Sequence, residues 1–329
     1  MLYPLKFAPI LLDKIWGSEH LKQMFSPASD ALPNVGEAWV LTAYDKYISP
    51  IINGHLAGDS LQDILEVYMN ELVGDKVYET FGNTFPLLVK LIAADDDLSV
   101  QVHPDDEYAA AKDDSFGKTE MWYVLRGNDT GETILAGWNE PMTRDKVRQA
   151  VVDGAVMQYV RSYCVQEGDS LLIKPGTVHA LKKGSFVAEI QQNSDMTYRL
   201  FDYNRTDSAG NKRPLHLEKA LDVLNYNVSP SLVKLREDGV VSNLVQTPYF
   251  TVNKLVLDKI VQRDYAPLDS FVIYLCVKGQ TTIETTEIPV DAGAKVQLSC
   301  GECCLIPAVL NDVTIMPEGN TELLEIYIE

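Results

Sequence analysis

The sequence predicts a mainly β protein with a few accessory helices, on the basis of apolar runs of strand length, turn residues between them, and a repeated strand pattern. The apolar runs are residues 85–93, 120–125, 170–174 and 186–192. Pro175 and Gly176 mark a turn that leads from one of these runs into a further short strand at 178–181. Strands separated by such turns favour a sandwich or barrel over a doubly wound sheet.

The strand pattern occurs twice along the chain. The segment EGDSLLIKP at 167–175 resembles CGECCLIP at 300–307, and WYVLRG at 122–127 resembles FVIYLCVKG at 271–279. Two copies of one barrel module would explain both pairs. No histidine follows His216, so a metal site that uses histidine would belong to the first copy.

Helical periodicity is restricted to a few segments, at residues 60–69, 143–152 and 217–224. The first begins with Ser60, and Asp63 lies three residues later, as in a capping box. We expect these helices to pack beside the β core.

Composition limits the classes of partner. The formal net charge is -19, from 47 acidic and 28 basic side chains, which disfavours binding to nucleic acid or anionic lipid. An anionic substrate would need local cations in its pocket. No apolar run approaches the ~20 residues of a membrane helix. Five cysteines, an odd number, indicate no disulfide framework, and the N-terminal segment does not resemble a secretion signal, so we expect a cytoplasmic protein.

Two histidines and a glutamate have the setting of metal ligands. His103 alternates with Ser99 and Gln101 on one face of a predicted strand, His179 follows a tight turn, and Glu120 begins an apolar strand. Imidazole and carboxylate groups on adjacent strands suit zinc, iron or manganese, and Gln101 could add a fourth ligand. The alternative is that these are partly exposed turn residues and a solvated strand end.

Other polar residues have less specific patterns. Cys300, Cys303 and Cys304 lack a second cysteine pair or a nearby histidine, so we interpret them as structural. The remaining histidines, His20, His55 and His216, are interpreted as surface or packing residues.

Cationic side chains also lie near the predicted ligands. Lys118 shares a strand face with Glu120, and Arg199 follows the strand that carries Glu189. Arg199 is either an ion-pair partner of a nearby aspartate, Asp195 or Asp202, or the cation that offsets an anionic ligand.

These segments resemble the type I mannose-6-phosphate isomerases, especially their short bacterial form. The resemblance rests on four motifs in the family's order, LSVQVHPDDEYA at 98–109, GKTEMWY at 117–123, KPGTVHAL at 174–181 and EIQQNSDMTYRLFDYNR at 189–205. The segments KIWG at 14–17 and GEAW at 36–39 are similar as well. The likeness extends from near the start of the chain to about residue 225, and more loosely to its end.

The resemblance implies two cupin-type jelly-roll barrels and one zinc ion per chain. The repeated strand pattern places a boundary near residues 228–245, so we expect a metal-binding catalytic domain with helical insertions, residues 1–235, and a C-terminal metal-free domain, residues 236–329. The implied zinc ligands are Gln101, His103, Glu120 and His179. The implied active-site residues are Ser99, Lys118, Glu189 and Arg199.

The implied reaction interconverts mannose 6-phosphate and fructose 6-phosphate through a cis-enediolate, whose charge zinc and Arg199 would stabilise. Glu189 or a zinc-bound water is expected to move the proton, with Lys118 as a further candidate. The alternatives are an iron-dependent cupin oxygenase, a related sugar-phosphate isomerase, and a degenerate, metal-free sugar-phosphate sensor. Lys118 and Arg199 favour an anionic substrate over a neutral one, and a sensor would be expected to have lost a ligand or Arg199.

Overall fold

The structure is a computed structural model that describes residues 1–127, 131, 134–206, 210–228, 233–234 and 240–329. The chain forms two compact units, each discontinuous in sequence. Unit 1 comprises Met1–Ile10, Trp39–Val89 and Glu237–Glu329, and unit 2 comprises Leu11–Ala38 and Lys90–Arg236. The expected boundary between residues 235 and 236 lies outside the described residues, and the roles of the two expected domains stay predictions.

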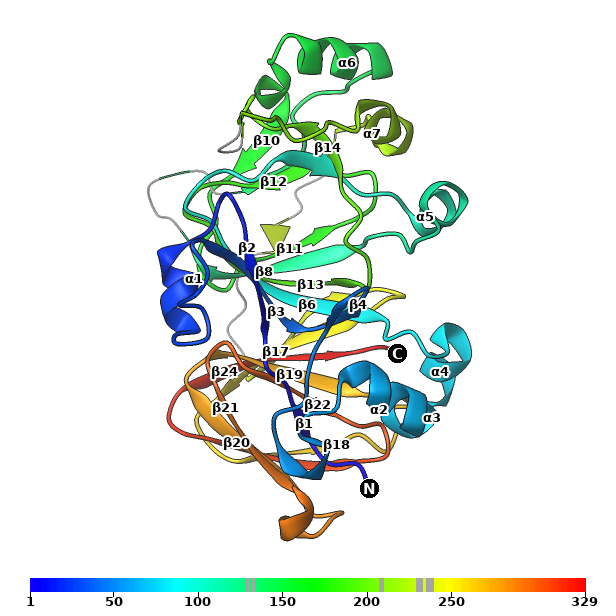
Figure 1. Ribbon diagram of the computed structural model, residues 1–329, viewed down its shortest axis with the longest axis vertical. Coiled ribbons are helices and arrows are strands. Elements are labelled where there is room, and N and C mark those ends of the chain that lie inside the picture. Colours follow the sequence, from blue (N-terminus) through cyan, green and yellow to red (C-terminus); the bar gives the residue numbers. More distant parts are fainter. Residues whose placement is uncertain (128–130, 132–133, 207–209, 229–232, 235–239) are drawn as a thin grey trace. The chain divides into compact units, whose positions relative to one another are not determined.

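Unit 2 is built on two sheets (Figure 1). The smaller has the order β10-β9-β12-β7-β14, with strands β7 (Val100–Val102), β9 (Ile134–Trp138), β10 (Val160–Tyr163), β12 (His179–Leu181) and β14 (Tyr198–Phe201). The larger has the order β15-β11-β8-β13-β6-β3-β2, with strands β2 (Ile10–Asp13), β3 (Val35–Leu41), β6 (Leu87–Ala93), β8 (Glu120–Arg126), β11 (Ser170–Ile173), β13 (Phe186–Gln192) and β15 (Val233–Lys234). Strands β2, β3 and β6 contain residues of both units.

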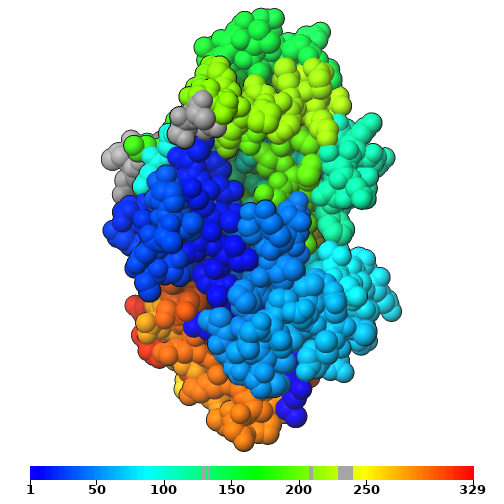
Figure 2. All heavy atoms as spheres, viewed as in Figure 1, coloured from blue at the N-terminus to red at the C-terminus, as the bar shows by residue number. Residues whose placement is uncertain are grey.

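The core of unit 2 lies on both faces of the smaller sheet. Ile134 and Leu181 point toward the larger sheet and share a buried cluster with its Trp122. Residues of the opposite parity, such as Leu135, pack against α6 (Arg144–Val152) and α7 (Leu217–Val223). Figure 2 shows the surface of these helices in green and yellow-green. The other helices of unit 2 are α1 (Glu19–Met24), α5 (Asp106–Asp113) and the short 3-10 turn Val156–Gln158.

Unit 1 also pairs two main sheets around a core. Its six-stranded sheet has the order β1-β22-β19-β24-β17-β16, with strands β1 (Leu5–Lys6), β16 (Val241–Gln246), β17 (Thr251–Leu257), β19 (Val272–Lys278), β22 (Cys303–Ile306) and β24 (Thr321–Tyr327). Its four-stranded sheet has the order β18-β23-β20-β21, with strands β18 (Val261–Asp264), β20 (Gln280–Thr285), β21 (Lys295–Ser299) and β23 (Asp312–Pro317). One buried cluster draws side chains from both sheets. The remaining elements are β4 (Ala43–Tyr44), β5 (Tyr47–Ile48), α2 (Leu61–Tyr68), α3 (Asn70–Val73), α4 (Asp75–Phe81) and the 3-10 turns Gly54–Leu56 and Val290–Ala292.

The mainly β fold with accessory helices is therefore confirmed, as paired open sheets of cupin type and not as continuously closed barrels. The three predicted helices correspond to α2, α6 and α7, and Ser60 and Asp63 form the expected capping box. The repeated pattern corresponds to two antiparallel pairs, β8 with β11 and β19 with β22. Within the described part of the chain, no helix combines the length and the apolar character that a membrane crossing requires.

Candidate metal centre and adjoining pocket

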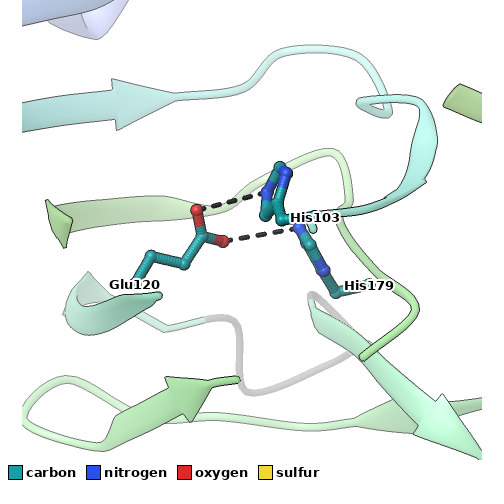
Figure 3. Close-up of side chains that lie close together, drawn as sticks. All are labelled: His103, Glu120 and His179. Carbon is teal, nitrogen blue, oxygen red and sulfur yellow. Dashed lines mark ion pairs between the residues drawn. The ribbon is translucent and has the colours of Figure 1, made fainter. Parts of the chain in front are cut away.

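The ends of three strands bring His103, Glu120 and His179 together (Figure 3). His103 directly follows β7, Glu120 begins β8, and His179 begins β12. The two histidines come from the smaller sheet of unit 2 and the glutamate from the larger one, so the group lies in the interior between them. All three side chains are at most 1% exposed.

Each imidazole is oriented by a backbone carbonyl. His103 Nδ1 lies 2.7 Å from the carbonyl oxygen of Met196, and His179 Nδ1 lies 2.8 Å from that of Thr177. Since a carbonyl oxygen only accepts hydrogen bonds, each Nδ1 carries the hydrogen, and each Nε2 has a free lone pair. Both Nε2 atoms point at Glu120, at 3.4 Å from one of its carboxylate oxygens each.

The residues present fit a divalent metal ion. Neither Nε2 atom and neither carboxylate oxygen of Glu120 has a hydrogen-bond partner, although all four atoms are buried, and the carboxylate has an ion pair with Lys118 Nζ, 3.1 Å from Oε2. One ligand atom from each residue lies within 4.8 Å of the others. Buried polar atoms without partners are costly, and two imidazoles with a carboxylate are a common ligand set for zinc and other transition metals. Such atoms would be satisfied by a cation held between them.

The protonation states also suit a metal. Burial, together with the nearby charge of Lys118, lowers the pKa of His103 to about 4. Burial lowers the pKa of His179 as well, in spite of the Glu120 carboxylate. Burial by itself would raise the pKa of Glu120, but Lys118 and the two imidazoles hold that pKa well below its usual value. At neutral pH the group therefore consists of two neutral imidazoles and a carboxylate, the forms that bind metals.

A pocket of about 480 Å³ in unit 2 adjoins this group. The predicted site residues outside the buried group all line it, namely Ser99, Gln101, Lys118, Glu189 and Arg199. Lys118 connects the two regions, because its Nζ lies 3.1 Å from Glu120 and 3.9 Å from Glu189. Gln101 is the register partner of His179 across β7 and β12. Its role as a metal ligand stays a prediction.

Arg199 is held by neutral groups. Its Nε donates to Ser99 Oγ at 3.2 Å, and a terminal nitrogen donates to the carbonyl of Pro214 at 2.9 Å. Among the described residues it forms no ion pair with Asp195 or Asp202, the aspartates that the sequence offered as partners. Burial and the nearby Arg213 lower the pKa of Arg199 below its ordinary value. The guanidinium therefore lines the pocket with its charge available to an anion.

The structure adds pocket residues that the sequence did not single out. Lys90 lies in the centre of β6, and its Nζ contacts Glu189 at 3.3 Å and Asp195 at 3.0 Å. Trp16, from the KIWG segment, also lines the pocket, and its buried Nε1 has no hydrogen-bond partner. A lysine inside an apolar strand run was the sequence signal that could have identified Lys90, because a lysine is rarely buried without a partner.

The other histidines and the cysteines lie outside the candidate centre. His55 is exposed beside Tyr3, and His20 packs on Phe186 at 4.9 Å between ring centroids. His216 accepts a hydrogen bond from the backbone of Arg199 at 3.2 Å. Cys303 and Cys304 are buried in β22, and Cys300 is exposed and unpaired with another cysteine. These positions agree with surface and packing roles.

Paired β-sheets with two imidazoles and a carboxylate buried at strand ends define a cupin-type protein with a candidate metal centre. The chain belongs to the type I mannose-6-phosphate isomerase family, and it is an isomerase. Residues 5–136 match the family described as phosphomannose isomerase type I, catalytic domain, and residues 241–328 match the mannose-6-phosphate isomerase cupin domain.

Relatives and solved structures support this assignment along the whole chain. A probable mannose-6-phosphate isomerase of Bacillus subtilis is 35% identical over 98% of this chain and 99% of its own length. A mannose-6-phosphate isomerase of Streptococcus mutans is 34% identical over 86% of this chain and 88% of its own. The crystal structure of a Bacillus subtilis mannose 6-phosphate isomerase matches with a TM-score of 0.84 at 29% identity, covering 99% of this chain and all of the other.

Proposed function

We propose that this protein interconverts mannose 6-phosphate and fructose 6-phosphate with the help of one bound zinc ion. The observation that carries the proposal is the set of buried, convergent ligand atoms of His103, Glu120 and His179, which lack hydrogen bonds, beside a pocket lined by Lys118 and Arg199. The family supplies the reaction class, and the cations supply a reason for an anionic sugar substrate. The cysteine content further supports a cytoplasmic location.

His103, Glu120 and His179 would hold the zinc ion, and Gln101 is the candidate fourth ligand. When bound, zinc supplies Lewis-acid stabilisation of negative charge on a substrate oxygen. Arg199 would add a fixed positive charge on the pocket wall, since Ser99 already orients its Nε. The substrate would thus meet preorganised positive charge in a molecule that is strongly negative as a whole.

Glu189 is the candidate that moves the proton between C2 and C1. The isomerisation breaks the C2–H bond, forms a cis-enediolate, and makes a C1–H bond with the returned proton, while O2 loses its hydroxyl proton to become the ketone oxygen and O1 is protonated to become the hydroxyl. The Glu189 side chain lines the pocket, and Trp122 Nε1 donates to its Oε2 at 2.7 Å. Lys118, whose Nζ lies between the carboxylates of Glu120 and Glu189, is the further candidate for this role.

The first test is a coupled assay of mannose 6-phosphate conversion on protein of known metal content. We expect a chelator to reduce turnover at least tenfold and added zinc to restore it. His103→Ala should lose both zinc and turnover, whereas His55→Ala, which alters an exposed histidine of unit 1, should keep both. No turnover in protein that contains one zinc per chain would refute the proposed reaction. Full turnover in demonstrably metal-free protein would refute the role of zinc.

A further inference from the structure

Lys90 is a buried cation in the pocket wall, and the proposed reaction does not yet assign it a role. It occupies the centre of β6 among apolar residues, and its side chain is 3% exposed. A buried ammonium is costly unless opposite charges compensate it. Two carboxylates do so here, with Nζ 3.3 Å from Glu189 Oε1 and 3.0 Å from Asp195 Oδ1.

Glu189 is thereby held from two sides. Trp122 donates to one of its oxygens at 2.7 Å, and the ammonium of Lys90 lies at the other oxygen. Lys118 is farther from that second oxygen, at 3.9 Å. The neutral donor and the nearer cation together restrict rotation of the carboxylate, so Lys90 contributes directly to the direction in which Glu189 points.

Asp195 holds Lys90 in turn. Lys90 Nζ donates to Asp195 Oδ1, and both groups line the same pocket. Burial alone would raise the pKa of Asp195, but the charge of Lys90 outweighs it and lowers that pKa to about 2. Burial alone would lower the pKa of Lys90, yet Asp195 and Glu189 raise it above its ordinary value. The two ion pairs and the raised pKa both favour a charged ammonium at Lys90, which suits a fixed cation beside Glu189.

We propose that Lys90 is a positioning residue of the isomerase, whose ammonium, fixed by Asp195, orients the Glu189 carboxylate for proton transfer. The inference rests on the proposed function, because it assumes that Glu189 moves the proton. In this role Lys90 does not contact the reacting atoms. Its effect on the reaction must then pass through Glu189, and this dependence can be measured.

The test replaces Lys90 with methionine, which is unbranched like lysine but carries no charge. We expect Lys90→Met to lower kcat about 10²-fold, the size of effect that misplacement of a reacting group produces, with KM within threefold of wild type. Zinc content should not change. In a Glu189→Gln background, Lys90→Met should lower kcat by less than threefold, since the group through which it acts is already gone. Lys90→Arg, which keeps a cation, should recover part of the loss.

Lys6→Met is the matched control, because it removes another lysine–carboxylate pair, 2.7 Å from Glu302, that belongs to unit 1. It should leave kcat unchanged. If Lys90→Met does not fold, Asp195→Asn is the test instead. This variant retains Lys90 but removes the carboxylate that fixes its ammonium, and we expect kcat to fall about tenfold. The inference is overturned if the folded variant tested keeps kcat within threefold, or if Lys90→Met is equally damaging with Glu189→Gln. A wild-type protein without turnover would instead refute the proposed function.

Discussion

Single side chains of the candidate site are fixed through one atom and leave another atom free. His103 and His179 each use Nδ1 for a carbonyl, which leaves Nε2 for a metal. Arg199 uses Nε for Ser99 and a terminal nitrogen for Pro214, while its charge has no carboxylate partner among the described residues. This arrangement is the preorganisation that electrostatic stabilisation of a developing charge requires.

Replacement of Arg199 by lysine tests that view. Lysine keeps the charge but loses the planar fork and the Nε donor that Ser99 accepts. We expect Arg199→Lys to lower kcat/KM for mannose 6-phosphate about 10²-fold, or roughly 2.7 kcal/mol of transition-state stabilisation, by steady-state kinetics. Arg148→Lys is the control, because Arg148 on α6 forms an exposed ion pair with Glu218 on α7, and it should keep wild-type kinetics. A value for Arg199→Lys within threefold of wild type would contradict the assigned role.

At the scale of elements, equivalent strands pair in the same register within each unit, but the glutamate at the equivalent position has a different role in each. Trp122 is opposite Glu189 across β8 and β13, and Tyr274 is opposite Glu325 across β19 and β24. In unit 2 this glutamate lines the pocket. In unit 1 Glu325 is fully buried and bound by protein groups, so the same strand position contributes to the core.

The residue at the position of the metal ligand also differs between the two copies. Glu120 lies two residues before Trp122, and the corresponding position before Tyr274 is Val272. An aliphatic side chain cannot bind a metal, and no histidine follows His216 to replace the missing ligand. Local strand pattern therefore predicted the shared architecture, whereas the chemistry depends on single substitutions within it.

The ion pair of unit 1 should contribute to stability. Arg263 donates to both oxygens of Glu325, at 2.9 Å each, and Tyr265 and Asn253 also donate to this carboxylate. Arg263→Met would leave a buried carboxylate without its cation, which typically costs about 3–5 kcal/mol. Urea unfolding should show a loss in this range, against less than about 1 kcal/mol for Lys278→Met, whose pair with Glu322 is largely exposed. Equal losses in both variants would contradict this account.

At the scale of the whole molecule, the pocket reverses the sign of the chain's charge. The protein has a net charge of -19, yet the pocket lining contains five cations and four carboxylates. The cations are Lys14, Lys90, Lys118, Arg199 and Arg213, and the carboxylates are Asp13, Glu37, Glu189 and Asp195. The pocket therefore has the locally positive charge that an anionic substrate requires, and this charge is an excess of one cation over the carboxylates.

The sequence predicted the mainly β class and the residues that the structure brings together, because motif order and strand alternation are local properties. It did not predict that Met1–Ile10 and Trp39–Val89 belong with the C-terminal segment in one compact unit. Packing between segments far apart in the chain is not encoded in any local pattern. The lysine within an apolar strand run was a local signal for a buried cation at position 90, but its carboxylate partners, Glu189 and Asp195, follow it by about a hundred residues and no local pattern indicates them.

Metal binding should stabilise the folded protein, because the ligand atoms converge only in the folded state. At free zinc about 100-fold above its Kd, a single site adds about 2.7 kcal/mol, which for a unit of this size raises Tm by about 5–10 °C. Scanning calorimetry of stripped and zinc-loaded protein measures the shift without reference to turnover. His103→Ala should abolish the shift and His55→Ala should retain it, since only His103 belongs to the buried ligand group. An identical Tm for stripped and loaded wild-type protein would show that the convergent, buried atoms of His103, Glu120 and His179 do not bind zinc.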